Sequence, residues 1–202
     1  MAFVRRAQPG DSRAIASLHR EIISWGLLTR LGDKVVTGFY RAVITSPVAF
    51  CFVAEEEGKL EGFAAGVCDW PRLFRGVIRQ TWWPLLWVLP FRLTGRRWRR
   101  LLETGRYTQS RHEGVRAEFL SLGVRQQASG RLWVGTALVR AVVNEFRRRG
   151  VTRIRGVVWD QNERALRFFE GVGFRFISEV EIHPGEVSRT FVVDLVPRDA
   201  GA

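Results

Sequence analysis

Residues 116–174 decide the fold of this chain, and in order they read RAEFLSLGV, RQQASG, RLWVGTALVRAVVNEFRRRGV, TRIRGVVWDQN and ERALRFFEGVGF. The first segment is short and apolar, and the second is a polar loop that contains Gly130. In the third segment, polar residues recur three or four positions apart, which is typical of a helix that exposes one stripe and packs its other sides on a sheet. These polar residues are Thr136, Arg140, Asn144 and Arg147. The order strand, loop, long helix, strand and short helix predicts a βαβ unit.

The loop before the long helix is a candidate anion site. The first turn of a helix presents backbone N–H groups that have no partner within the helix, and these groups bind phosphate well. Gly130 stands at this junction. The sequence therefore predicts phosphate binding where the loop meets the helix.

Three motifs carry a resemblance to a known family. They are EFLSLGV at 118–124, VGTAL at 134–138, and the pattern Asn162-x-x-Ala165-x-x-Phe168-Phe169-x-x-x-Gly173-Phe174. With these motifs the chain resembles the GNAT superfamily of acyl-CoA-dependent N-acetyltransferases over nearly its whole length. The resemblance implies an α/β GNAT fold, with a mixed, mostly antiparallel, splayed sheet and helices on both faces. It also implies a single domain over residues 1–202 and acetyl-CoA as cosubstrate.

The composition of the chain indicates which classes of partner it could bind. The chain has 202 residues and a formal net charge of +12, and Lys34 and Lys59 are its only lysines. Such a charge favours anionic partners such as CoA, phosphorylated substrates, nucleic acid or a lipid surface. Nucleic acid is not expected, because no groove-binding motif accompanies the basic residues.

The cysteine content and the N-terminal sequence indicate the cellular compartment of the protein. Cys51 and Cys68 fall in separate predicted strands and have no metal-site spacing, so we expect no metal and no disulfide. The N-terminal residues lack the apolar core of a signal peptide, and no apolar run reaches the roughly 18 residues that a spanning helix needs. These features predict a cytoplasmic protein.

The flanking segments complete the predicted sheet. We expect a strand over 3–7, a helix to about residue 23, a connector over 24–31 and a second helix over 33–45. A hairpin of strands 49–55 and 60–69 follows. Near the C-terminus we expect a second hairpin, of strands 174–183 and 187–196. In the resembled family the first connector borders the acceptor site. That implies substrate contacts for Trp25, Leu28 and Arg30, whereas a simple packing loop is the alternative.

Residues 71–112 depart from the family pattern as an insertion of about forty residues. Tryptophans and arginines gather there, and the segment over 81–93 is too short to span a bilayer. Three interpretations remain open: a helical lid or homodimer contact, ordinary core, and contact with a membrane surface. The residues concerned are Trp70, Trp82, Trp83, Trp87, Trp98, Arg92, Arg96, Arg97, Arg99 and Arg100.

The resemblance assigns residues to the cofactor. The backbone of Leu122, Gly123 and Val124 would hold the pantetheine arm. The loop and the helix start would hold the pyrophosphate, through Gly130, Arg131, Val134, Gly135 and Thr136. The family's glycine pattern is altered here, because Trp133 stands where its first glycine belongs. Asn162 would lie near the pantetheine arm, cap the short helix, or do both. Phe169 would contact CoA or belong to the core.

Glu118 is the candidate general base. It stands six residues before Val124, where the family often carries a base glutamate, and burial would raise its pKa towards neutrality. The alternative is a glutamate paired with an arginine. Asp69, His112 and Glu113 are rival bases. Phe169 occupies the position of the family's acidic tyrosine, and Tyr107 is the candidate substitute and a candidate substrate contact.

The sequence thus predicts an acetyl-CoA-dependent N-acetyltransferase that acts on a primary amine. An amino sugar or another anionic small molecule suits the basic chain as acceptor. Two alternatives remain open. One is a noncatalytic acyl-CoA-binding or regulatory module, and the other is a peripheral membrane protein that acts through the insertion.

Overall fold

The computed structural model describes residues 2–23, 27–30, 32–77, 115–128, 130–183 and 186–195. Its strands are β1 (Phe3–Arg6), β2 (Ala49–Glu56), β3 (Lys59–Val67), β4 (Glu118–Val124), β5 (Arg153–Trp159), β6 (Arg175–His183) and β7 (Glu186–Asp194). Its helices are η1 (Pro9–Asp11), α1 (Ser12–Ile22), α2 (Leu27–Arg30), α3 (Asp33–Thr45), α6 (Arg131–Arg148) and α7 (Glu163–Gly171). Residues 70–77 are also helical.

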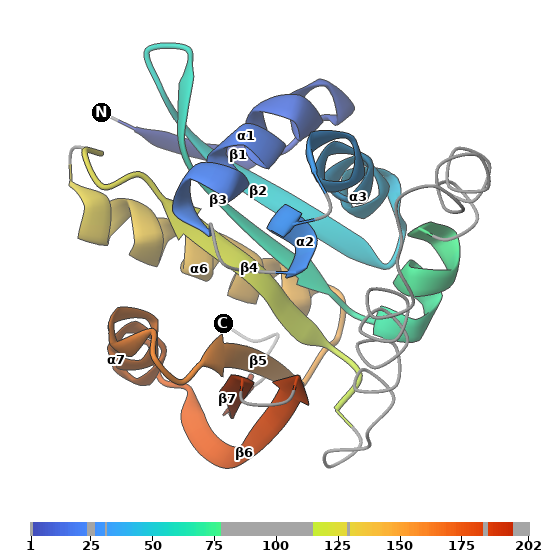
Figure 1. The fold of residues 1–202 in the computed structure, drawn as a ribbon, viewed down its shortest axis with the longest axis vertical. Helices are drawn as coiled ribbons and strands as arrows, with labels where there is room; N and C mark the ends of the chain where they lie inside the picture. The colour runs from blue at the N-terminus through green and yellow to red at the C-terminus, as the bar shows by residue number, and fades with distance from the viewer. Residues whose placement is uncertain are drawn as a thin grey trace, which may run out of the picture.

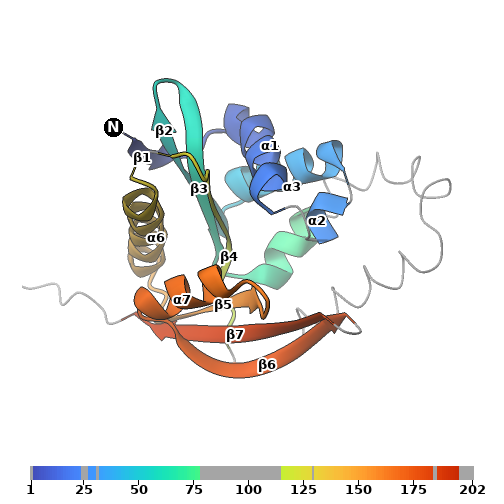
Figure 2. The same ribbon diagram turned by 60° about the vertical axis from the view of Figure 1, so that its left-hand side comes forward.

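The strands form one sheet whose order, within the described residues, is β1-β2-β3-β4-β5-β7-β6 (Figure 1). β4 and β5 run parallel, and the other neighbours run antiparallel. Seen from the side, β5, β6 and β7 lie at a steep angle to β1–β4 (Figure 2). The predicted mixed, mostly antiparallel, splayed sheet is therefore confirmed.

Helices cover both faces of the β1–β4 half (Figure 2). α6 packs on one face, where Phe50, Leu138, Val142, Phe146 and Phe169 belong to one core cluster. α1 and α3 pack on the other, where Ile15, Leu18, Tyr40, Val43 and Phe63 belong to a second. α6 lies close to the sheet at Gly66, since a Cβ atom there would lie 2.7 Å from the Phe146 ring. The two cores bury the apolar side chains that drive folding.

β4 carries a bulge that matters for the site. Its register with β3 shifts between Ala65 and Gly66, which leaves Leu120 as an extra residue. A bulge changes the face to which the following side chains point. Leu120 packs towards the core of α1 and α3, and the next residue, Ser121, also contacts Tyr40 of α3. Two consecutive β4 side chains therefore face α1 and α3.

The elements agree with those predicted, apart from small shifts at their ends. The expected connector over 24–31 contains the short helix α2. Most of the insertion predicted over 71–112 lies outside the described residues, as does the turn between β6 and β7. The single-domain organisation, the homodimer contact and the membrane-surface contact stay predictions. No helix within the described residues combines the length and apolarity that crossing a membrane requires.

Candidate active site

The candidate site begins where β4 and β5 part. The two strands pair through Glu118 with Arg155 and Phe119 with Gly156, and among the described residues no later pair joins them. Residues 120–124 therefore have β3 on one side and no described strand on the other. We call this side the unpaired β4 edge. An extended ligand can hydrogen-bond to such an edge as an added strand would. The residues predicted for the pantetheine arm lie on it, namely Leu122, Gly123 and Val124.

Glu118 lies in the first of the two pairs that join β4 to β5, one residue before the last pair. Its Oε2 accepts hydrogen bonds from Nε and Nη2 of Arg155, at 2.9 Å and 2.7 Å. Both side chains are largely buried, with 16% of the Glu118 side chain and 8% of the Arg155 side chain exposed. Burial raises the pKa of Glu118, and the charge and hydrogen bonds of Arg155 oppose that rise. Among the described residues, Oε1 has no partner, so one oxygen orients the carboxylate and the other can take a proton.

Sequence reasoning missed Arg155, although it foresaw a glutamate–arginine pair as an alternative to a free base. A signal was present, because Arg155 follows Ile154 and precedes a run of small and apolar residues in a strand read as buried. The partner of Glu118 depends on the β4–β5 register, which the sequence does not contain.

The start of α6 forms a cationic corner. Gly130 caps the helix with a left-handed backbone (φ 61°), a conformation that glycine adopts without strain. Burial, together with the neighbouring charge of Arg164 in the first turn of α7, lowers the pKa of Arg131. Two guanidinium groups close to a helix N-terminus favour an anion between them. Arg164 was not predicted, and its place directly after the start of α7 was its only signal.

Trp133 and Thr136 point away from this corner. Both line a groove of about 380 Å³ beside β1, together with Val4 and Phe52. Gly135 faces the other way, since a Cβ atom on it would lie 3.6 Å from the ring of Phe168. The bulk of Trp133 therefore does not fall between α6 and α7. Val134, also predicted for the cofactor, is fully buried in the core.

Phe169 packs beside the point where β4 and β5 part. It is 7% exposed, and its ring centroid lies 5.7 Å from that of Phe119 and 4.8 Å from that of Phe174. A Cβ atom on Gly156 would lie 2.4 Å from the Phe169 ring, so a side chain there would collide with the ring. The position of the family tyrosine thus carries a core ring without a hydroxyl.

Asn162 has the capping role foreseen for it. Its Oδ1 accepts a hydrogen bond from the backbone N–H of Ala165 at 3.1 Å, which caps α7. Asp69 likewise accepts from the backbone N–H of Arg72 at 3.0 Å, beside the helix over 70–77. Its carboxylate is therefore engaged locally, whereas a base must reach the substrate.

The predicted acceptor contacts are only partly described. Leu28 lies in α2 and packs against the core of α1 and α3. Arg30 ends α2, and its side chain is not described. The remaining predicted contacts and rival bases lie outside the described residues: Trp25, Tyr107, His112 and Glu113.

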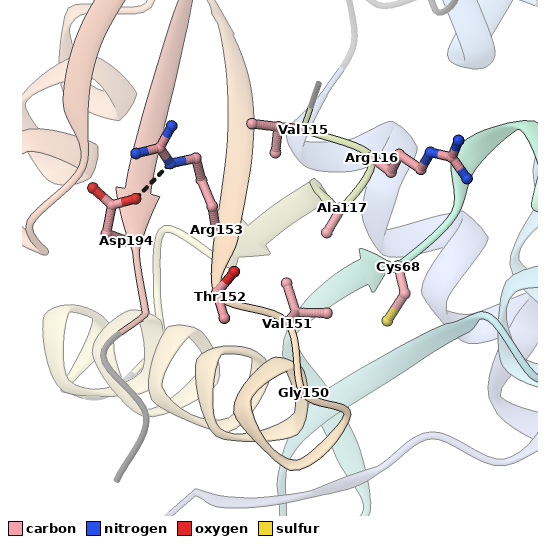
Figure 3. A pocket seen from close by; sticks show the side chains of 9 residues that line it. All are labelled: Cys68, Val115, Arg116, Ala117, Gly150, Val151, Thr152, Arg153 and Asp194. Atoms are coloured by element: carbon pink, nitrogen blue, oxygen red, sulfur yellow. Dashed lines mark hydrogen bonds and ion pairs between the residues drawn. The ribbon is translucent and has the colours of Figure 1, made fainter. Parts of the chain in front are cut away.

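A hollow of about 540 Å³ lies at the opposite end of β4 (Figure 3). Cys68, Arg116 and Ala117 line it together with residues 150–153 and Asp194, which accepts a hydrogen bond from Arg153. Burial raises the pKa of the Cys68 thiol, so it stays protonated. Glu118 is not part of this lining. The hollow is therefore separate from the unpaired β4 edge.

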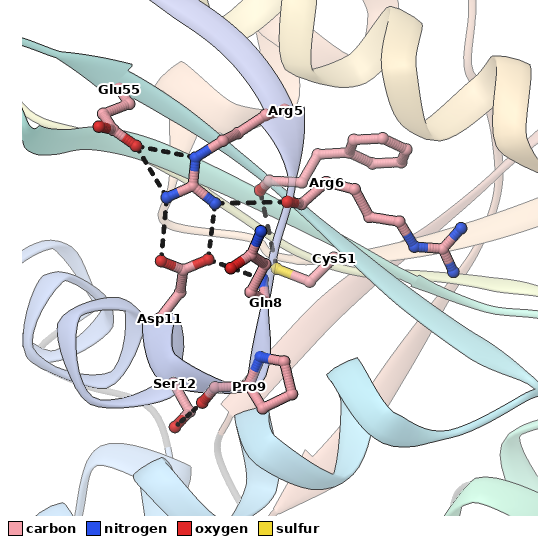
Figure 4. A network of polar contacts seen from close by, with 9 residues as sticks. Arg5, Arg6, Gln8, Pro9, Asp11, Ser12, Cys51 and Glu55 are labelled. Carbon is pink, nitrogen blue, oxygen red and sulfur yellow. Dashed lines mark hydrogen bonds and ion pairs between the residues drawn. The ribbon is translucent and has the colours of Figure 1, made fainter.

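A dense polar cluster near the N-terminus is structural (Figure 4). Arg5 of β1 donates to both oxygens of Asp11, at 2.7 Å and 3.0 Å, and to Glu55 of β2 at 2.8 Å. Asp11 also accepts from the backbone N–H of Gln8. The cluster thus ties the start of α1 to the edge of the sheet. Within the described part of the chain, no three metal-binding side chains gather at one point.

Comparisons with known proteins agree with the fold. The profile of the Acetyltransferase (GNAT) family matches residues 18–174. Similar solved structures include an agmatine N-acetyltransferase, at 18% identity and TM-score 0.68 over 96% of this chain and 99% of that chain. A putative acetyltransferase of Salmonella typhimurium, yncA, solved with acetyl-CoA, matches at 17% identity and TM-score 0.60 over 100% and 98%. The ribosomal-protein-S18-alanine N-acetyltransferase of Escherichia coli matches at 13% identity and TM-score 0.61 over 100% and 99%. These likenesses concern the fold. A comparison with curated protein sequences finds no match.

Proposed function

Because the chain belongs to the acetyltransferase (GNAT) family, we propose that it transfers an acetyl group from acetyl-CoA to a primary amine. One observation carries the proposal. Glu118 is a largely buried carboxylate with a raised pKa, and it lies on β4 two residues before the unpaired β4 edge, with one oxygen free of described partners. A base of this kind suits the removal of a proton from an ammonium group near neutral pH.

Acetyl-CoA binding follows from two features. The backbone of Leu122, Gly123 and Val124 would pair with the pantetheine arm along the unpaired β4 edge. The start of α6, with Gly130, Arg131 and Arg164, would hold the phosphates. A relative of the same fold, yncA, was solved with acetyl-CoA, which supports this use of the fold.

The reaction needs three contributions from the chain. Glu118 would take the proton of the amine, whose lone pair then attacks the thioester carbon. Backbone N–H groups of the unpaired β4 edge would stabilise the oxyanion that forms. Collapse of the tetrahedral intermediate breaks the C–S bond and releases the CoA thiolate, and the nitrogen gives its second proton to solvent water as the amide forms. A thiol has a pKa of about 8.5, so the thiolate is a fair leaving group.

The net charge of +12 favours a neutral or anionic amine over a polycation as acceptor. An amino sugar that carries a phosphate or a nucleotide combines an amine with negative charge. We therefore propose an amino sugar of this kind as the acceptor, and it is the first class to test.

Calorimetry with acetyl-CoA, followed by an assay of free thiol with a panel of amines, tests the proposed function. The panel contains amino sugar phosphates, nucleotide-linked amino sugars, polyamines and peptide N-termini. We expect saturable binding of acetyl-CoA and thiol release with an anionic amine. Binding without thiol release on any amine would favour the noncatalytic acyl-CoA-binding module. Failure to bind acetyl-CoA would contradict the proposed function.

A further inference from the structure

Three polar side chains form a hydrogen-bonded line from the core of α1 and α3 to β4. Nδ1 of His19 on α1 lies 2.7 Å from the hydroxyl of Tyr40 on α3, and that hydroxyl lies 3.2 Å from Oγ of Ser121 on β4. Tyr40 is fully buried and His19 is 5% exposed, whereas Ser121 is half-buried. Polar groups in an apolar core are costly unless they are bonded. A line of this kind, which ends on the strand of the candidate site, therefore calls for an explanation.

The line has a preferred direction. Burial lowers the pKa of His19 to about 4, so its imidazole is neutral near neutral pH and carries one N–H. Nε2 of His19 is buried and has no partner among the described residues. Buried N–H groups without an acceptor are rarer than acceptors without a donor, so we assign the hydrogen to Nδ1.

With that assignment, His19 donates to Tyr40, and Tyr40 donates to Ser121. The hydroxyl hydrogen of Ser121 is then free to point at a ligand, because no other hydrogen bond of Ser121 occurs within the described residues. Successive hydrogen bonds polarise one another, so the last donor in the line is strengthened.

With the roles given under the proposed function, Ser121 lies on β4 between the two points that would flank the thioester. It is three residues after Glu118 and three before Val124, roughly 10 Å along an extended strand from each. The pantetheine arm would pair around Val124, and the amine would lose its proton at Glu118. The sulfur that ends the arm, and the acyl carbon next to it, must then sit between these two points. Because of the bulge at Leu120, the side chain of Ser121 points to the same face of β4 as that of Leu120. This is the face that α1 and α3 cover, where Tyr40 lies.

We propose that Ser121 is a catalytic residue whose hydroxyl donates a hydrogen bond to the CoA sulfur as the C–S bond breaks, and that Tyr40 and His19 are its positioning residues. This proposal rests on the proposed function. The electron pair of the C–S bond goes to sulfur, and Glu118 takes one proton of the ammonium group before the attack. The second proton that the nitrogen loses as the amide forms passes to solvent water, and Ser121 keeps its own proton. An aliphatic hydroxyl is far less acidic than a thiol, so Ser121 stabilises the thiolate without protonating it.

Sulfur is a better partner for Ser121 than the carbonyl oxygen. The N–H groups of the unpaired β4 edge lie in the plane of the sheet and can serve the oxyanion, whereas the Ser121 side chain leaves that plane towards α3. Phe169 occupies the position of the family tyrosine and offers no hydroxyl. The leaving thiolate would otherwise have no side-chain donor among the residues described at this site.

The test is a pH titration of the thiol of bound CoA, followed by the ultraviolet absorbance of its thiolate. A donor aimed at sulfur lowers the pKa of the bound thiol. We expect Ser121→Ala to raise that pKa by about one unit, in line with a hydrogen bond to a charged group. Tyr40→Phe should raise it less, because Ser121 stays in place but loses its donor. Ser121→Thr keeps the hydroxyl and should restore the wild-type value. For acetyl transfer, Ser121→Ala should lower kcat about tenfold and leave KM for acetyl-CoA unchanged.

Ser12→Ala is the matched control, since Ser12 is also buried but bonds the carbonyl of Pro9, far from β4 in the sequence. It should titrate as the wild type does. A bound thiol with the same pKa in wild type and Ser121→Ala would overturn the proposal. If acetyl transfer still proceeds in that case, only the role of Ser121 fails. CoA that does not bind the wild-type protein would overturn both this proposal and the proposed function.

Discussion

Glu118 and Glu145 are both largely buried and both bind arginine, yet their pKa values shift in opposite directions. Glu145, in the last turn of α6, is 7% exposed and accepts hydrogen bonds from Arg148, Arg149 and Arg6. The bonds from Arg148 and then Arg149 lower its pKa to about 2, although burial opposes them. Among the described residues Glu118 has Arg155 as its one charged partner, and burial prevails, so its pKa rises.

The number of charged partners among the described residues therefore separates the structural carboxylate, Glu145, from the one that we propose as the base, Glu118. Glu145 sits at the end of a helix where the macrodipole disfavours a negative charge, so its arginines must do more than offset desolvation. They also join α6 to β1 through Arg6, and Arg149 further binds the carbonyl of Pro47. Within the described part of the chain, Glu118 is held through one oxygen, which orients it and is consistent with the proton exchange proposed for it. A carboxylate that must change protonation state cannot be saturated with cations.

Replacing the proposed base should give the largest effect. Glu118→Gln keeps the shape of the side chain but removes its ability to accept a proton. We expect kcat for acetyl transfer to fall by about 100-fold to 10,000-fold, since this is the range for loss of a general base. The affinity for acetyl-CoA should not change. Thiol release and calorimetry measure the two quantities.

Glu145→Gln is the matched control for that experiment, because it makes the same change in the other buried carboxylate. It should leave kcat per folded molecule at the wild-type level, since Glu145 lies on the face of the sheet covered by α6. Equal losses of kcat in the two variants would show that the effect comes from the fold and would contradict the role given to Glu118.

The second expected effect is on stability. Here replacement of Glu145 should matter more than replacement of Glu118, which is the opposite of the expectation for kcat. Glu145→Ala removes a carboxylate that several arginines share, and we expect it to lower the free energy of unfolding by about 2 kcal/mol. The loss stays moderate because Arg148 and Arg6 are half-exposed or more and can turn to water. Urea unfolding followed by circular dichroism measures it. A larger loss for Glu118→Gln than for Glu145→Ala would contradict the distinction between the two carboxylates.

Local sequence patterns predicted the helices and strands well, but they predicted the contacts between these elements poorly. The polar stripe of residues 131–148 and the alternation of the strands are properties of neighbouring residues, so α6, β5 and the two hairpins were found nearly in place. The splay was expected only from the resemblance, because the β4–β5 register, the bulge at Leu120 and the packing of Phe169 against Gly156 are not properties of neighbouring residues. Such contacts join residues that are distant in the sequence.

The candidate site shows the same limit. Glu118 was picked out by its motif position, but Arg155, which lies 37 residues further on, was not named as its partner. His19 and Ser121 reach Tyr40 across separations of 21 and 81 residues, with no periodicity to reveal them. Residues expected to act through backbone atoms, such as Gly123 and Val124, could be proposed from the sequence, because the role proposed for them depends on strand position and hardly on side-chain type.

A third prediction uses acid to compare wild type with Glu145→Gln. The folded-state pKa of Glu145 is about 2 and its ordinary value is 4.5. A depressed pKa contributes stability that is fully present above the ordinary value and is lost as the pH falls towards the folded-state value. The difference in urea midpoint between wild type and Glu145→Gln should therefore be constant above about pH 5 and should shrink as the pH falls towards 2. A difference that does not change with pH would mean that the arginines do not depress this pKa.

The smallest effect should come from substitutions of Arg155. Two variants of this residue separate the effect of its positive charge from the effect of its hydrogen bonds, which orient Glu118. Arg155→Met removes a positive charge that opposes the raised pKa of Glu118, so that pKa should rise further. A base must be deprotonated to act, so the acid limb of the kcat/KM profile should move to higher pH. The plateau at high pH should fall less than in Glu118→Gln, because the carboxylate is still present. Arg155→Lys keeps the charge but loses the two-pronged hydrogen bond, so it should lower the plateau while moving the limb less. If the limb stays in place in Arg155→Met, then it reports a group other than Glu118, and the contrast between the two carboxylates no longer explains the chemistry.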